Sequence, residues 1–178
     1  MNNDIEKILF DQAQLDKRMD EMAAELNQKY EGKQPIVIPV LNGAMIFASD
    51  MIKRLNFKLT VDPIKASSYA GTESTGKVKI TQDIKSDVKD QPVIFMEDII
   101  DTGRTLQYLI NLLKVRKAAS IKICSLLDKP SRRIMTDVIV DYVGVKVPNE
   151  FVVGYGLDYE QKYRNLPYIG VLKESIYS

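Results

Sequence analysis

The sequence contains no histidine among its 178 residues. This absence excludes nucleophilic catalysis by Ser-His or Cys-His pairs, and it excludes metal sites with histidine ligands. Any proton transfer by a side chain must therefore use a carboxylate, a lysine or a tyrosine, with water as the remaining carrier.

Cysteine is also scarce, because the chain has only Cys124, inside an apolar stretch at residues 121–127. We expect a buried and unreactive thiol, since cysteine in such surroundings usually behaves as a small core residue. A single cysteine cannot form an internal disulfide, which agrees with a reducing cytoplasm. No signal-peptide pattern opens the chain and no apolar run approaches the ~20 residues of a membrane span, so we expect a cytoplasmic protein without membrane contact.

The chain carries little excess of either charge. Its 25 Lys and Arg residues nearly balance its 24 Asp and Glu residues, and the net charge is +1. This balance argues against nucleic acid as a partner. Apolar residues make up 45% of the sequence, which is enough for the core of a single domain spanning residues 1–178.

Apolar periodicity predicts alternating strands and helices. Apolar side chains at helical spacing predict helices beginning near Leu15, Met45 and Leu106, the first of them ending near Gly32. Apolar runs predict strands at residues 35–40, 57–61, 92–96, 121–127, 138–142 and 151–153. The polar segment at residues 64–90 predicts a strand, a loop and a returning strand. This alternation predicts an α/β fold whose mainly parallel central sheet is flanked by helices.

The most informative feature is a group of carboxylates that follows the predicted strand at residues 92–96. Glu97 and Asp98 follow this strand directly, and Asp101 lies in a short Thr/Gly turn before the next predicted helix. Open α/β sheets bind ligands at the carboxyl ends of their strands, and a strand-to-helix turn such as residues 101–105 favours an anion. Carboxylates accept hydrogen bonds from vicinal hydroxyls and attract Mg²⁺. These residues therefore predict a site for a sugar that carries phosphates.

The pattern Glu-Asp-Ile-Ile-Asp-Thr-Gly at residues 97–103 resembles the phosphoribosyl-pyrophosphate (PRPP) signature of type I phosphoribosyltransferases, most closely their hypoxanthine-guanine branch. Four further segments match in the same order, so the resemblance covers nearly the whole chain. It implies the type I phosphoribosyltransferase fold. A small hood would come from parts of residues 1–15 and 145–178, and a flexible lid would lie at about residues 65–80.

The resemblance assigns roles to the residues of this signature. Glu97 and Asp98 would hold the ribose hydroxyls and a Mg²⁺ ion. Asp101 would also act as the general base that takes the N7 proton of a purine as N9 attacks. The turn that would bind the 5′-phosphate comprises Asp101, Thr102, Gly103, Arg104 and Thr105.

A second strand-to-helix turn would hold the pyrophosphate of PRPP. The residues that the resemblance places there are Leu41, Asn42 and Gly43, together with the more distant Arg164. Many family members carry Lys or Arg where this chain has Asn42, so the backbone would do more of the binding here. The family's peptide bond between the residues matching Leu41 and Asn42 is often cis.

Two more segments complete the implied site. Ser68 and Tyr69 resemble part of the lid, which would exclude water during the reaction. The residues that would bind the purine are Lys129, Phe151, Val152 and Asp158. Lys129 would donate to the 6-oxo group, Phe151 would stack on the ring, and the backbone of the other two would contact the 2-position. Asp158 would also help to hold Mg²⁺.

The resemblance thus implies a Mg²⁺-dependent enzyme of purine salvage. It would transfer the phosphoribosyl group of PRPP to hypoxanthine or guanine, giving IMP or GMP and pyrophosphate, and it would form a homodimer or homotetramer. One alternative is a phosphoribosyltransferase for another base, such as xanthine or a pyrimidine, although Lys129 and Phe151 argue against a pyrimidine. The other is a regulator with this fold that senses PRPP or nucleotide and binds RNA, against which the balanced charge and the intact Asp101 argue.

Overall fold

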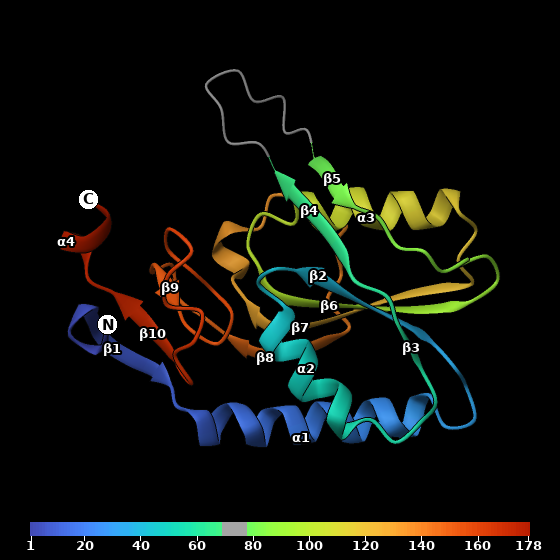
Figure 1. Ribbon diagram of the computed structural model, residues 1–178, viewed down its shortest axis with the longest axis horizontal. Helices are drawn as coiled ribbons and strands as arrows, with labels where there is room; N and C mark the ends of the chain where they lie inside the picture. The colour runs from blue at the N-terminus through green and yellow to red at the C-terminus, as the bar shows by residue number, and fades with distance from the viewer. Residues whose placement is uncertain (69–77) are drawn as a thin grey trace.

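A central sheet dominates the computed structural model, which describes residues 1–68 and 78–178 (Figure 1). The strands of this sheet are β2 (Ile36–Leu41), β3 (Thr60–Val61), β4 (Ile64–Ser68), β5 (Val78–Gln82), β6 (Pro92–Ile100), β7 (Ser120–Asp128) and β8 (Tyr142–Lys146). Their order is β5-β4-β2-β6-β7-β8, with β3 paired to β2. The pairs β2–β3, β2–β4, β2–β6, β6–β7 and β7–β8 are parallel, whereas β5 runs antiparallel to β4 at one edge.

Helices cover both faces of the central sheet. The helices α1 (Gln12–Lys29) and α2 (Met45–Arg54) lie on one face, and α3 (Arg104–Val115) lies on the other (Figure 1). Strand β6 explains this arrangement, because Ile94 and Met96 pack into the core below α1 and α2, while Val93 and Phe95 pack into the core below α3. The predicted α/β fold is confirmed, and the continuous apolar run of β6 reflects burial on both faces.

A second, smaller sheet joins the two ends of the chain. It has the order β1-β10-β9, formed antiparallel by β1 (Ile5–Phe10), β10 (Ile169–Leu172) and β9 (Val152–Val153). The short α4 (Glu174–Tyr177) follows β10, and two 3-10 turns lie at Asn2–Asp4 and Pro130–Arg132. The sheet places residues 151–153 beside both ends of the chain, at one end of the molecule in Figure 1.

Helix α1 begins with a capping box. Asp11 Oδ1 accepts a hydrogen bond from the Gln14 amide at 2.8 Å, and Gln14 Oε1 accepts one from the Asp11 amide at 2.9 Å. The buried face of this helix comprises Leu15, Met19, Met22, Ala23 and Leu26. Each large side chain in that face contributes roughly 1.5–3 kcal/mol through burial. The cap and the apolar stripe together fix α1 along the sheet.

Two predicted strands are wrong in extent. Residues 57–61 form a strand only at Thr60–Val61, because Phe57 turns toward the helices and packs on Tyr30 with ring centroids 5.6 Å apart. The strand expected at residues 138–142 instead begins at Tyr142. The buried Val138 belongs to an irregular segment over the α3 core, and Asp141 fixes that segment by accepting a hydrogen bond from the Ile123 amide at 2.9 Å.

The prediction at the signature strand also needs correction, because β6 continues past the carboxylates to Ile100. Its parallel register with β7 runs from Pro92 opposite Ser120 to Ile100 opposite Asp128. Glu97 and Asp98 therefore lie within a paired strand and do not follow it. The backbone ladder fixes both residues more firmly than a loop would.

The expected burial of Cys124 is confirmed. Cys124 is fully buried, and burial raises the pKa of its thiol to about 12. The chain at residues 168–172 packs back on the molecule as β10. Among the helices of the described residues, none has the length and apolar character needed to cross a bilayer.

Candidate active site

A pocket of about 350 Å³ opens where β6, β7 and the segment around β9 come together. Its lining includes Asp98, Asp101, Lys129, Phe151, Val152 and Asp158. These residues come from segments that are up to 60 positions apart in the sequence, since 158 minus 98 is 60. The fold therefore brings together the predicted purine residues and two of the three predicted metal ligands.

Glu97 and Asp98 form a pair of adjacent, poorly solvated carboxylates. Burial raises the pKa of Glu97 well above its usual value, and the neighbouring charge of Asp98 adds to this rise. Burial also raises the pKa of Asp98, although Asp98 accepts a hydrogen bond from the Ile99 amide at 2.8 Å. Glu97 Oε2 is buried without a hydrogen-bond partner among the described residues. Such an oxygen is suited to accept from a hydroxyl or to contact a cation.

The predicted phosphate turn lies at the N-terminus of α3. Gly103 is the N-cap of this helix with φ of 81°, a left-handed conformation that glycine adopts without strain. A Cβ at this position would lie 3.2 Å from Met135 Cβ, so the turn also packs closely against the following segment. The Thr102 carbonyl accepts hydrogen bonds from the amides of Ile134 and Met135. The free N–H groups of the first helical turn can bind an anion here.

Asp101 is partly exposed at the edge of the pocket. Its Oδ1 accepts a hydrogen bond from Arg132 Nε at 3.0 Å. Arg133 supports the same turn from below, because its Nε donates to the Asp101 carbonyl at 3.2 Å while its guanidinium pairs with the buried Asp128. The sequence did not predict this support. Nothing in two adjacent arginines indicates that Arg132 lines the pocket while Arg133 lies beneath it.

The loop predicted to bind pyrophosphate joins β2 to α2. The Leu41–Asn42 peptide is cis, as the resemblance implied. A Cβ on Gly43 would lie 1.7 Å from Asp98 Oδ2, and a Cβ on Gly156 would lie 2.1 Å from the Gly43 carbonyl oxygen. The loop is therefore enclosed between β6 and the Gly154–Gly156 turn. Only glycine allows this close approach at either position.

Arg164 and Asp158 form an ion pair on the other side of this loop. Arg164 Nη2 lies 2.7 Å from Asp158 Oδ1, and Nη1 donates to the Gly156 carbonyl at 2.6 Å. The positive charge of Arg164 acts to lower the pKa of Asp98, which opposes the rise that burial causes. The structure thus places Arg164 near Asp98, Gly43 and Asp158, for which the resemblance implies contacts with ribose, pyrophosphate and metal.

Lys129 and Phe151, the two side chains predicted to contact the base, both line the pocket. The Lys129 side chain is nearly buried, its Nζ donates to the Glu150 carbonyl at 2.8 Å, and burial lowers the pKa of its ammonium. The Phe151 ring is 37% exposed, so it is available for a further contact. It stacks on Tyr177 with centroids 4.7 Å apart and meets the edge of Tyr159.

Tyr177 was not predicted from the sequence. It lies 26 positions after Phe151, counting from 151 to 177, and nothing in a short polar tail signals contact with a ring. The lid prediction names Ser68 and Tyr69. Ser68 ends β4 and Tyr69 lies outside the described residues.

The fold and this site define a phosphoribosyltransferase of the α/β class. A family model described as "Phosphoribosyl transferase domain" matches residues 7–160, and the chain belongs to this family.

Individual relatives carry more specific names. The chain is 49% identical to the hypoxanthine-guanine phosphoribosyltransferase of Streptococcus thermophilus over all of its own length and 99% of the relative's. It is 48% identical to the hypoxanthine-guanine-xanthine phosphoribosyltransferase of Tritrichomonas foetus, covering 97% of that protein. It is 51% identical to the bifunctional protein TilS/HprT of Listeria monocytogenes, of which it spans 28%.

Solved structures agree with these similarities. A crystal structure of a hypoxanthine phosphoribosyltransferase from Staphylococcus aureus superimposes with a TM-score of 0.95 at 46% identity. This match covers 100% of the present chain and 97% of the other. The predicted type I phosphoribosyltransferase fold is therefore confirmed.

Proposed function

We propose that this protein transfers the 5-phosphoribosyl group of PRPP to hypoxanthine or guanine, giving IMP or GMP and releasing pyrophosphate. One observation carries the proposal: Asp101, Lys129, Phe151 and Asp158 line the same pocket, beside the N-terminus of α3. These groups supply a general base, a hydrogen-bond donor for a carbonyl oxygen, a surface for ring stacking and an acidic metal ligand. Relatives named as hypoxanthine-guanine phosphoribosyltransferases along the full length of the chain support the same activity.

The 5′-phosphate and the ribose would bind along the end of β6. The turn of Asp101, Thr102, Gly103, Arg104 and Thr105 offers backbone N–H groups and hydroxyls at a helix N-terminus, where the dipole favours an anion. Glu97 and Asp98 would accept hydrogen bonds from the ribose hydroxyls. The buried Oε2 of Glu97 has no protein partner among the described residues, so a substrate hydroxyl would satisfy it.

The pyrophosphate would lie between the Leu41–Gly43 loop and Arg164. A guanidinium fork suits phosphate oxygens, and Arg164 is already held in place by Asp158 and by the Gly156 carbonyl. Asn42 supplies no charge, so Arg164 and the backbone of the loop would carry this contact.

The acidic residues present fit Mg²⁺. The described residues hold no ready cluster of three acidic or sulfur ligands, but Mg²⁺ commonly uses one or two carboxylates with water and substrate phosphates. Glu97, Asp98 and Asp158 are the residues that would hold the ion, directly or through its water shell. When bound, Mg²⁺ would neutralise charge that develops on the leaving group.

The purine would stack on Phe151 and meet Lys129 at its 6-oxo group. The ammonium of Lys129 would exchange the Glu150 carbonyl for this oxygen, and the backbone of Val152 and Asp158 would contact the 2-position. As N9 attacks C1 of the ribose, the N7 proton would pass to Asp101, whose second oxygen lies beside the one that Arg132 contacts.

The remaining parts of the proposal concern access and assembly. The sheet β1-β10-β9 would act as a hood built from parts of residues 1–15 and 145–178. Residues from about 65 to 80, including Ser68 and Tyr69, would form a lid that excludes water. We further propose a cytoplasmic protein that acts as a homodimer or homotetramer, as the family usually does.

The reaction itself is tested by product stoichiometry. Purified protein with PRPP, Mg²⁺ and hypoxanthine should form IMP and pyrophosphate in equal amounts. IMP is measured by chromatography, and pyrophosphate by a coupled assay. Pyrophosphate without IMP would mean hydrolysis of PRPP only. Binding of PRPP without any product would favour a regulator of this fold, and salt-dependent binding of RNA would then be the next measurement.

Xanthine is a second candidate base. The Tritrichomonas foetus relative is named as an enzyme for hypoxanthine, guanine and xanthine, and it is 48% identical to this chain. The 2-position, which distinguishes these bases, would meet the backbone of Val152 and Asp158. Xanthine should therefore be compared with guanine at matched concentrations.

A further inference from the structure

Tyr155 lies between two glycines in the segment that links Phe151 to Asp158. Its side chain is buried, 3% exposed, and its backbone has φ of 48°, a left-handed conformation that is costly for a residue other than glycine. The flanking Gly154 and Gly156 are left-handed as well, with φ of 101° and 105°. This turn keeps its shape only because the surrounding contacts hold it.

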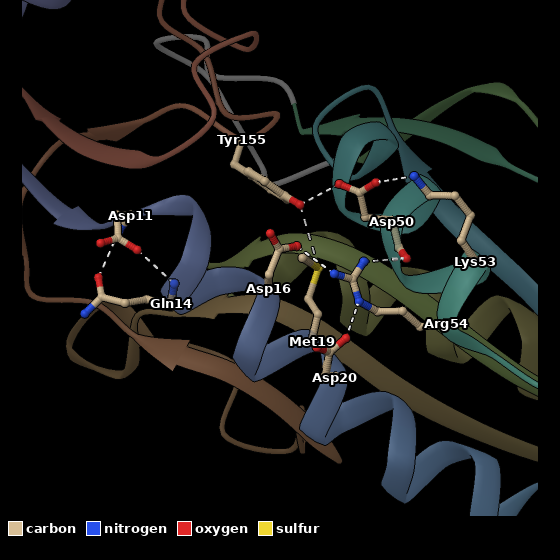
Figure 2. A network of polar contacts seen from close by, with 9 residues as sticks. All are labelled: Asp11, Gln14, Asp16, Met19, Asp20, Asp50, Lys53, Arg54 and Tyr155. Carbon is tan, nitrogen blue, oxygen red and sulfur yellow. Dashed lines mark hydrogen bonds and ion pairs between the residues drawn. The ribbon is translucent and has the colours of Figure 1, made fainter.

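The hydroxyl of Tyr155 reaches across to the helices on one face of the sheet, as Figure 2 shows. It donates to Asp50 Oδ2 of α2 at 2.5 Å and lies 3.8 Å from Met19 Sδ of α1. Burial acts to raise the pKa of Asp50, but hydrogen bonds from Lys53 and Tyr155 outweigh it and hold this pKa below its usual value. Asp50 is therefore a charged acceptor, which makes the hydrogen bond stronger.

The acceptor is itself held in place. Lys53 Nζ lies 2.6 Å from Asp50 Oδ1, and Arg54 Nη1 donates to the Asp50 carbonyl at 3.0 Å (Figure 2). Arg54 also pairs with Asp16 and Asp20 of α1. The Tyr155 hydroxyl is thus bonded to a carboxylate that also pairs with Lys53, on a helix that Arg54 ties to α1.

Both ends of this connection lead to the same part of the site. Asp50 lies in α2, whose preceding loop contains Asn42 and Gly43. At the other end, the turn around Tyr155 packs Gly156 on the Gly43 carbonyl, and the Gly156 carbonyl accepts the 2.6 Å hydrogen bond from Arg164. One hydrogen bond therefore ties the turn that holds Arg164 to the helix that follows the loop.

We propose that Tyr155, through its hydrogen bond to Asp50, is a positioning residue that sets the spacing between the Leu41–Gly43 loop and Arg164 for binding of pyrophosphate. The inference rests on the proposed function and assigns Tyr155 no contact with substrate. It differs from a plain stabilising role because it affects one substrate group selectively. The 5′-phosphate turn at α3 and the ring of Phe151 are held by other contacts.

The reverse reaction separates the two roles, because IMP and pyrophosphate are then independent substrates. Tyr155→Phe keeps the buried ring and removes only the hydroxyl. We expect KM for pyrophosphate, and KM for PRPP in the forward direction, to rise about tenfold, equivalent to about 1.4 kcal/mol, with KM for IMP changed less than twofold. Asp50→Ala should give the same pattern, and the double variant should be no worse than either single variant.

Two further variants serve as controls. Asp50→Asn retains an oxygen that accepts from Tyr155, so it should restore most of the pyrophosphate affinity lost in Asp50→Ala. Tyr163→Phe is matched in chemistry, because Tyr163 is buried, has φ of 74°, and donates its hydroxyl to Asp4 at 3.1 Å, away from α2. It should leave KM for pyrophosphate unchanged.

The outcomes separate cleanly. An unchanged KM for pyrophosphate in folded Tyr155→Phe, or an equal rise for pyrophosphate and IMP, would overturn the inference alone. The same rise in Tyr163→Phe would mean general loosening and would also overturn it. Failure of the unsubstituted protein to turn over in either direction would overturn the proposed function, and with it this inference.

Discussion

The ring of Phe151 lies stacked on the ring of Tyr177, with their centroids 4.7 Å apart and their planes 21° from parallel. Phe151 lines the pocket, whereas Tyr177 comes from the short helix α4 that follows the sheet β1-β10-β9. A purine that stacks on Phe151 would therefore meet a ring whose orientation is fixed from outside the pocket.

Loss of the Tyr177 ring should weaken binding of the base. For Tyr177→Ala we expect KM for hypoxanthine to rise about 2–10-fold, since an aromatic pair is worth roughly 0.5–1.5 kcal/mol beyond its buried area. KM for PRPP should change little. Initial rates at varied hypoxanthine and fixed PRPP check this, with Tyr177→Phe as the control that keeps the stack. A rise in KM for PRPP of the same size would contradict the role.

Removal of the proposed general base should affect turnover and spare binding. Asp101→Asn keeps an oxygen that can accept from Arg132, so the turn should retain its shape. We expect kcat to fall about 10²–10⁴-fold, the usual contribution of general acid-base catalysis. Binding of IMP, measured by calorimetry, should stay within a few-fold of the unsubstituted protein. Near-normal turnover would exclude Asp101 as the base.

The carboxylate of Glu97 should cost stability at neutral pH. Its pKa is raised in the folded state, so its stabilising contribution is present below the unfolded pKa of ~4.3 and is lost as pH rises through the folded pKa. Glu97→Gln removes this loss of stability, because glutamine does not ionise. We expect the variant to melt higher than the unsubstituted protein, by ~2–4 °C per kcal/mol recovered, with a larger difference at pH 8 than at pH 5.

The Glu97→Gln variant should also bind PRPP more weakly, because a proposed ribose contact and a proposed metal ligand are altered. Scanning fluorimetry across pH measures the first effect, and KM for PRPP measures the second. Glu31→Gln changes an exposed carboxylate and should alter neither. If Glu97→Gln melts at a lower temperature than the unsubstituted protein at pH 8, the Glu97 carboxylate does not destabilise the fold.

Lys129 should determine the preference for a 6-oxo group. Lys129→Met has a similar length and no charge, so it would lose the donor while filling the same space. We expect KM for hypoxanthine to rise roughly 10–100-fold, because a hydrogen bond from a charged donor contributes ~1.5–3 kcal/mol. KM for PRPP is the control, since it should change little. An equal rise in KM for PRPP would argue against recognition of the 6-oxo group.

Local patterns allowed much of this fold to be predicted. The apolar run through Phe95, the Thr/Gly turn at Gly103 and the helical face from Leu106 are each set within a few residues of sequence. Predictions failed where tertiary contacts decide. Phe57 leaves the expected strand to pack on Tyr30, and the sequence before β8 stays irregular because Asp141 bonds to Ile123.

The same division applies to the site. Asp98 could be found because it comes at the end of the apolar run of β6, near the edge where open α/β sheets bind ligands. Lys129 could be found only through the resemblance of its segment to the family. Tyr177 and Tyr155 could not, since their roles depend on partners more than 25 positions away in the sequence. The glycines around Tyr155 were the one available signal, because paired glycines in a turn indicate close backbone approach.

The most direct test of the account is a comparison of bases with one enzyme preparation. Initial rates should be measured by absorbance with PRPP, Mg²⁺ and, separately, hypoxanthine, guanine, xanthine, adenine and uracil. The account predicts turnover with hypoxanthine and guanine and little with adenine or uracil. Preferred turnover of adenine or uracil, or no turnover with any base, would contradict it.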